Sequence, residues 1–451
     1  MPIQLNVKKR RSGTRFKLFP QAPYAESSIQ PEIVWVSPPA GTIGPGPSDE
    51  RMYVVDPIRK PAPYGLVLYN RGRPSLYLPP WDGPFHLPAE PNGAGHFDDL
   101  EPGTPEFEAA HVYGTVRFVL DVWEDYFGGP IEWHFARDLD RLEISLLRAM
   151  NNATMGYGFL EVGYDQTLPG PPRPFTLNFD VLAHEVGHAI IYSQVGVPDP
   201  NAVEGEYFGF HESAADQVAL VTLLQFESVI DRLLVQTRGN LYVLNELNRI
   251  AELSEHRQLR LADNTLTLAD FEHGWSDEHL LSQPLTGAIF DILVDIFHEY
   301  LIDRRLISPE TEDLADHLEY HPQYVRLMQS LFDEAYEQDP DGFKGALIEA
   351  RDTLGLMLAG AWSRLSPDFL TFEDLGDAMI EADRDLFGRR FETQILQSFR
   401  WRYIGSIRVG PRLKPPREDS HIFSPRTVVP QRQTKPARRS YLARRMDQDV
   451  R

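Results

Sequence analysis

The run His184-Glu185-Val186-Gly187-His188 constrains this chain more than any other stretch of its sequence. Residues four apart on an α-helix lie on the same face, with Cβ atoms about 6 Å apart. On a helix, His184 and His188 can therefore direct both imidazoles at one metal ion, and Glu185 can reach a water bound to it. A hydrolytic zinc site requires two neutral imidazoles, a nearby carboxylate as general base and an open coordination position. The motif predicts a helix that carries such a site.

The residues around this motif support a helix. Asn178 or Asp180 can cap its N-terminus, and the apolar side chains that follow supply a buried face. Gly196 and Pro198 are typical of residues that end a helix. We therefore expect the motif to lie on a helix bounded by these residues.

A second segment, from Phe210 to Leu224, has the apolar pattern of a helix. Glu212 and Asp216 are four residues apart within it, so both can face the first helix. Glu212 would complete a set of two histidines and one glutamate, which predicts His184, His188 and Glu212 as ligands of Zn²⁺. Asp216 could accept the remaining N–H of a ligating histidine, with His184 as the first choice.

In these motifs the chain resembles the thermolysin-like zinc metallopeptidases of the gluzincin group, in which HExxH is followed by a helix that carries ExxxD. The resemblance covers roughly residues 96–300 and includes Asn151-Asn152-Ala153, where the family has an Asn-Ala pair on an edge strand. It implies that Asn152 and Ala153 bind the substrate backbone, and that Glu185 is the general base of an endopeptidase acting on peptides or proteins.

The same resemblance implies the fold. We expect an α+β fold of two lobes, with a mixed β/α N-terminal lobe, a mainly helical C-terminal lobe and the zinc site in the cleft between them. The chain is divergent and shows no segment that we recognise as the family's propeptide.

Other positions depart from the family pattern. Gln283 stands where the family has a histidine that stabilises the transition state, while His279 lies four residues earlier and could reach in from a loop. Either residue remains a candidate for this role. Tyr207 is the first candidate for the family's catalytic tyrosine, and Tyr192 is the second. The resemblance thus implies Glu185, His279 and Tyr207 as catalytic residues.

A structural Ca²⁺ is a weaker expectation. Asp180 lies four residues before the first histidine of the motif, where the family often has a calcium ligand. The other calcium carboxylates do not appear at matching spacing. We therefore favour a helix-capping role for Asp180.

Composition limits the classes of protein and the compartment. The 451 residues suffice for two or three domains, and the absence of cysteine excludes disulfides and thiolate metal sites. We find no apolar run near the roughly 18 residues that span a bilayer. The N-terminus is basic but lacks the apolar core of a signal peptide. We expect a protein without a membrane span that is cytoplasmic, or exported without a classical signal peptide.

Charge is unevenly distributed along the chain. Residues 1–30 carry a net charge of +5 and residues 400–451 one of +10, which leaves −37 on residues 31–399 of a chain with a net charge of −22. The basic, proline-rich tail is expected to be disordered or loosely packed on the body, and it could dock on the acidic body, bind an anionic partner or have no specific function. Nucleic-acid binding is not favoured as the main function.

These observations divide the chain into four parts. They are a Pro/Gly-rich segment with short strands (1–95), a mixed lobe with the active-site helix (96–205), an almost wholly helical lobe (206–399) and the basic tail (400–451). Short strands are expected at 33–36, 52–55 and 66–69. Helices are expected at 109–127, 284–304, 311–320, 323–336, 342–365 and 372–387.

Two other classes of protein remain open. A zinc-binding protein that has lost catalysis, and acts as a binding or assembly module, is favoured by Gln283 at the position of the expected histidine. Glu185 speaks against it, because a purely structural zinc site needs no general base. A structural protein of secretion or assembly is favoured by the basic ends.

Overall fold

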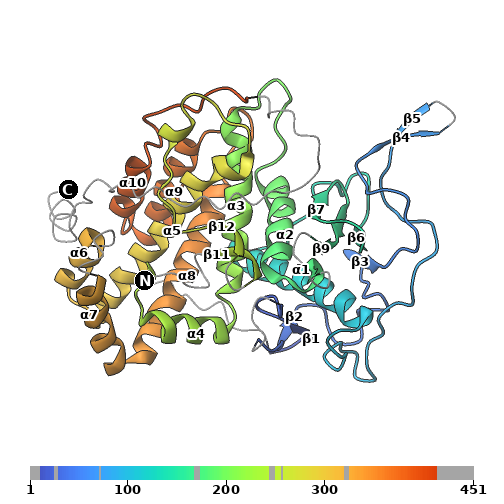
Figure 1. Ribbon diagram of the computed structural model, residues 1–451, viewed down its shortest axis with the longest axis horizontal. Helices are drawn as coiled ribbons and strands as arrows, with labels where there is room; N and C mark the ends of the chain where they lie inside the picture. The colour runs from blue at the N-terminus through green and yellow to red at the C-terminus, as the bar shows by residue number, and fades with distance from the viewer. Residues whose placement is uncertain are drawn as a thin grey trace.

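A computed structural model describes residues 11–24, 29–70, 73–166, 173–242, 249–254, 257–318 and 325–413. The basic residues 1–10 and the tail from residue 414 onward lie outside the described residues. The chain is a mixed α+β protein, as predicted. Most of its strands lie on one side and most of its long helices on the other, with helix α2 (Phe179–Gln194) between them (Figure 1). Strands β11 (Arg249–Ser254) and β12 (Arg257–Leu261) lie among the helices.

One four-stranded sheet lies next to α2. Its order is β3 (Met52–Val55), β6 (Leu142–Leu146), β8 (Phe159–Val162) and β7 (Ala153–Gly156). β3, β6 and β8 are parallel, and β7 pairs antiparallel with β8. β7 is thus an edge strand, and it packs against α2.

Four antiparallel pairs complete the strands of the described residues. They are β1 (Thr14–Leu18) with β2 (Glu32–Val36), β4 (Val67–Asn70) with β5 (Arg73–Leu76), β9 (Tyr164–Asp165) with β10 (Arg173–Pro174), and β11 (Arg249–Ser254) with β12 (Arg257–Leu261). The expected strands at 33–36, 52–55 and 66–69 are confirmed to within one residue. The β11–β12 pair is an exception within the region after residue 206 that was predicted to be almost wholly helical.

Helix α1 (Pro105–Phe127) joins the strand side to the helical side. Thr104 caps its first turn and Pro105 begins it, so the helix starts four residues earlier than predicted. Gly128 ends it in the left-handed conformation, with φ of 74°. Trp123 of α1 is fully buried and stacks on Trp362 of α8 (Pro340–Trp362), with ring centroids 4.8 Å apart. This contact fixes α1 against the helical side.

Three helices pack in sequence across the centre of the molecule. α2 (Phe179–Gln194) lies against α3 (Gly205–Leu223), and α3 lies against α5 (Glu278–Asp303). Asn178 is the cap of α2, which decides between the two predicted caps. A Cβ atom added to Gly187 would lie 2.7 Å from Cα of Ala215, so this glycine permits the close approach of α2 to α3.

α5 begins six residues earlier than predicted. The sequence suggested a start at Pro284, but Pro284 lies inside the helix. The side chain of Asp277 caps the first turn by accepting from two backbone N–H groups. The stability gained from a well-capped first turn offsets the loss of the backbone hydrogen bond that proline removes. His279 therefore lies on a helix and not in a loop.

Four of the remaining helices lie within three residues of their predicted bounds, namely α6 (Pro309–Leu318), α7 (Val325–Gln338), α8 (Pro340–Trp362) and α9 (Phe372–Phe387). The helices α4 (Glu227–Thr237) and α10 (Glu392–Trp401), and the short 3₁₀ turns at Phe175–Leu177 and Leu268–Phe271, were not predicted. α9 matches its prediction at both ends. The expected boundary at residue 400 falls inside α10, and residue 402 is fully buried, so the segment 400–413 packs on the helical side and is not a free tail.

A continuous apolar core extends from Phe16 to Ile404 through both sides of the molecule. Within the described residues, α5 is the helix whose length and composition would allow it to cross a membrane, and 94% of its apolar stretch is buried inside the protein. The core accounts for the apolar character of this helix.

Candidate metal centre

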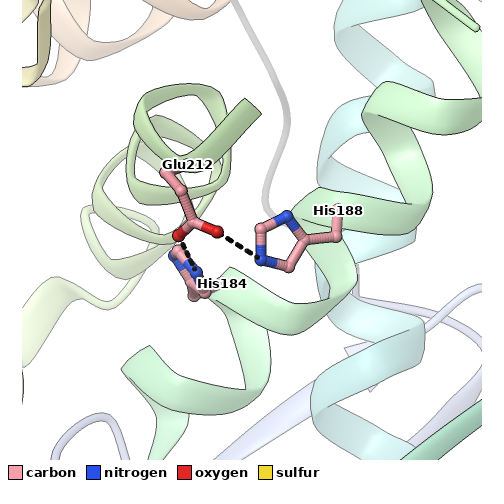
Figure 2. A group of neighbouring side chains, drawn as sticks. All are labelled: His184, His188 and Glu212. Carbon is pink, nitrogen blue, oxygen red and sulfur yellow. Dashed lines mark ion pairs between the residues drawn. The ribbon is translucent and has the colours of Figure 1, made fainter. Parts of the chain in front are cut away.

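The three predicted ligands meet between α2 and α3. His184 and His188 lie one turn apart on α2, and Glu212 comes from α3 (Figure 2). One donor atom from each residue lies within 4.8 Å of the other two. Nε2 of His184 is 3.3 Å from Oε2 of Glu212, and Nε2 of His188 is 3.8 Å from Oε1 of the same carboxylate. The two imidazoles and the carboxylate thus converge on one point.

This donor set fits zinc. Tetrahedral zinc binds histidine nitrogen and carboxylate oxygen at about 2.0–2.2 Å, which places neighbouring donor atoms roughly 3.3–3.6 Å apart. The measured separations of 3.3 and 3.8 Å are close to that spacing. Three protein ligands also leave a fourth position open, as in catalytic zinc sites. Within the described residues no other group of three His, Asp or Glu side chains is close enough to hold an ion, and Asp180 belongs to no such group.

Asp216 orients His184, the first of the predicted ligands. Its Oδ1 lies 2.9 Å from Nδ1 of His184, and its side chain is fully buried. Its other oxygen lies 3.3 Å from the Thr286 hydroxyl of α5, whose oxygen is also 3.0 Å from the hydroxyl of Ser213. Asp216 therefore leaves Nε2 of His184 facing Glu212, as the sequence predicted. The contact between Thr286 and Asp216 could not be predicted from the sequence, because it depends on the packing of α5 against α3.

His211 orients His188, the second of the predicted ligands. Its Nδ1 lies 2.8 Å from Nδ1 of His188, and the two rings are almost parallel. Burial lowers the pKa of His211 to about 4, so its imidazole is neutral near pH 7 and can accept a hydrogen bond from His188. That bond fixes His188 with its Nε2 toward Glu212. The only hint in the sequence was the position of His211 next to a predicted ligand.

Glu212 is held in its charged form. Burial favours the neutral acid, but His188 and His184 outweigh it and keep the pKa of Glu212 well below its ordinary value. A charged carboxylate between two imidazoles is the form that binds a divalent cation. The charge state of the group therefore suits the metal as well as its geometry does.

Glu185 lies where the site meets the edge strand β7. Its Oε2 accepts a hydrogen bond of 2.7 Å from the backbone N–H of Met155. Both residues line a cavity of about 320 Å³ that also contains the three predicted ligands, together with Asn152 and Ala153. The predicted base and the predicted substrate-binding residues thus share one cavity. Sequence reasoning did not find the bond from Met155, since it joins a strand to a helix 30 residues away.

Some of the other predicted catalytic residues line the cavity and others do not. His279, on the first turn of α5, lines the cavity with Nε2 3.4 Å from Oε2 of Glu212. Gln283 is buried and does not line it, which favours His279 over Gln283. Tyr207 and Tyr192 both line the cavity, but the hydroxyl of Tyr207 donates to the backbone carbonyl of Gly196. The structure thus brings Tyr207 to the site without bonding its hydroxyl to the predicted ligands.

Comparisons with known proteins add one likeness. No protein-family model and no curated protein matches the chain. Among solved structures, the chain is similar to the precursor of protealysin, a metalloproteinase from Serratia proteamaculans, with 12% sequence identity and a TM-score of 0.38 over 71% of this chain and 83% of that one. A likeness this low decides nothing about function, which must be inferred from the residues of the site.

Proposed function

We propose that the protein is a zinc-dependent metallopeptidase that hydrolyses peptide bonds. The observation that carries the proposal is the convergence of His184, His188 and Glu212 within 4.8 Å, in a cavity that also holds Glu185. A zinc ion bound by these ligands would lower the pKa of a bound water to about 7 and polarise the carbonyl of the scissile bond. The thermolysin-like two-lobed fold, with the site in its cleft, belongs to the same proposal.

The residues of the chain have distinct roles in this reaction. Glu185 takes a proton from the attacking water, whose oxygen bonds to the carbonyl carbon. Glu185 then gives that proton to the amide nitrogen as the C–N bond breaks, which yields a carboxylate and an amine. His279 donates a hydrogen bond to the carbonyl oxygen as that atom gains negative charge. Asp216 and His211 hold the ligand histidines in place throughout.

The edge strand β7 supports a peptide as the substrate. Apart from the N–H of Met155, which donates to Glu185, the edge of such a strand presents main-chain N–H and C=O groups to which an extended chain can add. β7 begins at Ala153, and Asn152 precedes it at the border of the cavity. A peptide that pairs with β7 would pass in front of Glu185. Cleavage within the chain, as in an endopeptidase, agrees with a substrate held by its backbone and not by a terminus.

The experiment compares wild type with Glu185→Gln. Both proteins are loaded with zinc, their metal content is measured, and both are incubated with casein and a peptide library. We expect equal zinc content and at least a 10²-fold loss of cleavage in the variant, because general base catalysis contributes about 10²–10⁴-fold. Equal cleavage by the two zinc-loaded proteins would exclude the proposed mechanism.

A second candidate is a zinc-binding protein without catalysis. It is favoured by Gln283, which stands where the resemblance leads us to expect a histidine. The same experiment separates the candidates, since this one requires zinc in both proteins and cleavage in neither. His279→Ala then tests the alternative placement of the histidine.

A further inference from the structure

An arginine from the C-terminal part of the chain lies at the rim of the cavity. Cζ of Arg412 is 4.9 Å from the ring centroid of Trp275 and 5.6 Å from that of Phe208. Its Nη2 is 3.5 Å from Oε2 of Glu278. Phe208 and Glu278 both line the cavity. Two aromatic rings within about 6 Å and a carboxylate are the surroundings that bind a guanidinium group.

The backbone holds this arginine in place. Trp275 donates its N–H to the carbonyl of Pro411, and Leu413 donates its N–H to the carbonyl of Trp275 at 2.6 Å. The main chain on either side of Arg412 is therefore fixed. Its side chain is 56% exposed and contacts Phe208 and Glu278, which line the cavity.

Negative charge remains at this rim of the cavity. Its ionisable lining consists of three carboxylates and four histidines, with no Lys or Arg among the described residues. A divalent cation at the predicted ligands would offset the charges of Glu185 and Glu212. The charge of Glu278 remains, and the side chain of its neighbour Asp277 is 49% exposed. The rim is thus both aromatic and anionic.

The rim lies close to the reacting centre. Phe208 precedes Glu212 by four residues on α3, which is one helical turn, or about 6 Å along the axis. An extended peptide advances about 3.3 Å per residue. A side chain bound at the rim would therefore belong to a residue about two positions from the bond that is cleaved.

We infer that this rim is a subsite for a basic side chain, so that the substrates are peptides with Arg or Lys about two residues from the cleaved bond. Arg412 occupies the subsite when no peptide is bound and competes with the substrate from within the same chain. This inference rests on the proposed function, which supplies the reason for a peptide in the cavity.

Binding of short peptides tests the inference. The protein is the zinc-loaded full chain with Glu185→Gln, which prevents turnover, and affinity is measured by fluorescence anisotropy. The probes are alanine-based octapeptides that carry one Arg, norleucine or Glu at each position in turn. We expect the best Arg peptide to bind about 10-fold more tightly than its norleucine and Glu counterparts, and this preference to shrink as salt is raised.

Two further substitutions separate a subsite from a structural contact. Glu278→Gln should reduce the preference for Arg to about 3-fold or less. Arg412→Ala should tighten binding of the Arg peptide about 3-fold or more, because it removes the competitor. Arg408→Ala, the matched control, removes the same charge from an exposed residue of the same segment and should change neither value.

The outcomes are decisive in both directions. An unchanged Arg preference in Glu278→Gln, or binding of the Arg peptide that does not tighten in Arg412→Ala, would overturn the inference. The salt titration of the Glu185→Gln protein needs no further variant, and an Arg preference that is independent of salt would also overturn it. Because binding is measured without turnover, a wild type that cleaves nothing would remove the proposed function and leave the subsite standing.

Discussion

Replacing Gly187 by alanine tests how the contact between α2 and α3 builds the site. The added Cβ would lie 2.7 Å from Cα of Ala215 and 3.2 Å from its carbonyl oxygen. Carbon atoms prefer separations of about 3.5–4.0 Å, so the helices must separate by about 1 Å. The atoms that the Cβ meets include backbone, which cannot rotate away as a side chain can.

Two opposing effects decide whether Gly187→Ala raises or lowers the free energy of unfolding. Alanine favours a helix over glycine by about 1 kcal/mol. Overpacking of a core costs about 1–3 kcal/mol, and contact with backbone places Gly187→Ala near the upper end. We therefore expect a net loss of about 1–2 kcal/mol in the free energy of unfolding. A matched control is Gly345→Ala in α8, where the added Cβ comes no closer than 3.5 Å to any atom. That variant should gain about 0.5–1 kcal/mol.

The same displacement should weaken zinc binding. His184 and Glu212 lie on opposite sides of this contact, and their donor atoms are 3.3 Å apart. Zinc–ligand distances tolerate only about 0.2 Å of change, so a shift of 1 Å should reduce zinc affinity by at least about 10-fold. The assays are urea unfolding of the metal-free proteins and zinc titration against a chromophoric chelator. Gly187→Ala that is as stable as wild type and binds zinc within 2-fold of it would refute the reasoning.

Three further predictions follow from buried groups. Asp216→Ala should lower zinc affinity about 10–100-fold, measured by chelator competition, because His184 loses its orienting carboxylate; unchanged affinity would contradict this role. His211→Ala should weaken zinc binding about 10-fold or more, whereas His211→Asn, whose amide oxygen can accept from His188, should stay within about 3-fold of wild type. Burial raises the pKa of Asp383 to about 6, so the folded protein loses stability as pH rises from about 4 to about 6. Asp383→Asn should therefore be more stable than wild type by on the order of 2 kcal/mol at pH 7, and the difference should vanish below pH 4; an equal difference at both pH values would be evidence against the raised pKa.

Local signals in the sequence predicted several elements well. The start of α2 at Asn178 and both ends of α9 (Phe372–Phe387) follow from caps that lie within a few residues of each helix. The pairing of His184 with His188 and of Glu212 with Asp216 was predictable for the same reason, since helical spacing places each pair of residues without reference to the rest of the fold. The start of α5 was predicted wrongly. Pro284 suggested a helix boundary, whereas the helix begins directly after its cap at Asp277.

Contacts between distant segments could not be predicted from the sequence. The order of the four-stranded sheet and the bond from Met155 to Glu185 depend on how strands and helices pack. Arg412 contacts Trp275, which precedes it by more than 130 residues, and no local sequence pattern predicts that contact. His279 was named as a candidate from its position in the sequence, but only the packing of α5 against α3 brings it beside Glu212.

X-ray absorption at the zinc edge tests the central claim most directly. The protein is loaded with one equivalent of zinc and compared with His188→Ala. We expect two imidazole nitrogens and one or two oxygens at about 2.0–2.2 Å in wild type, and one imidazole fewer in the variant. A shell of six oxygens, or the same spectrum in both proteins, would contradict a zinc site formed by His184, His188 and Glu212.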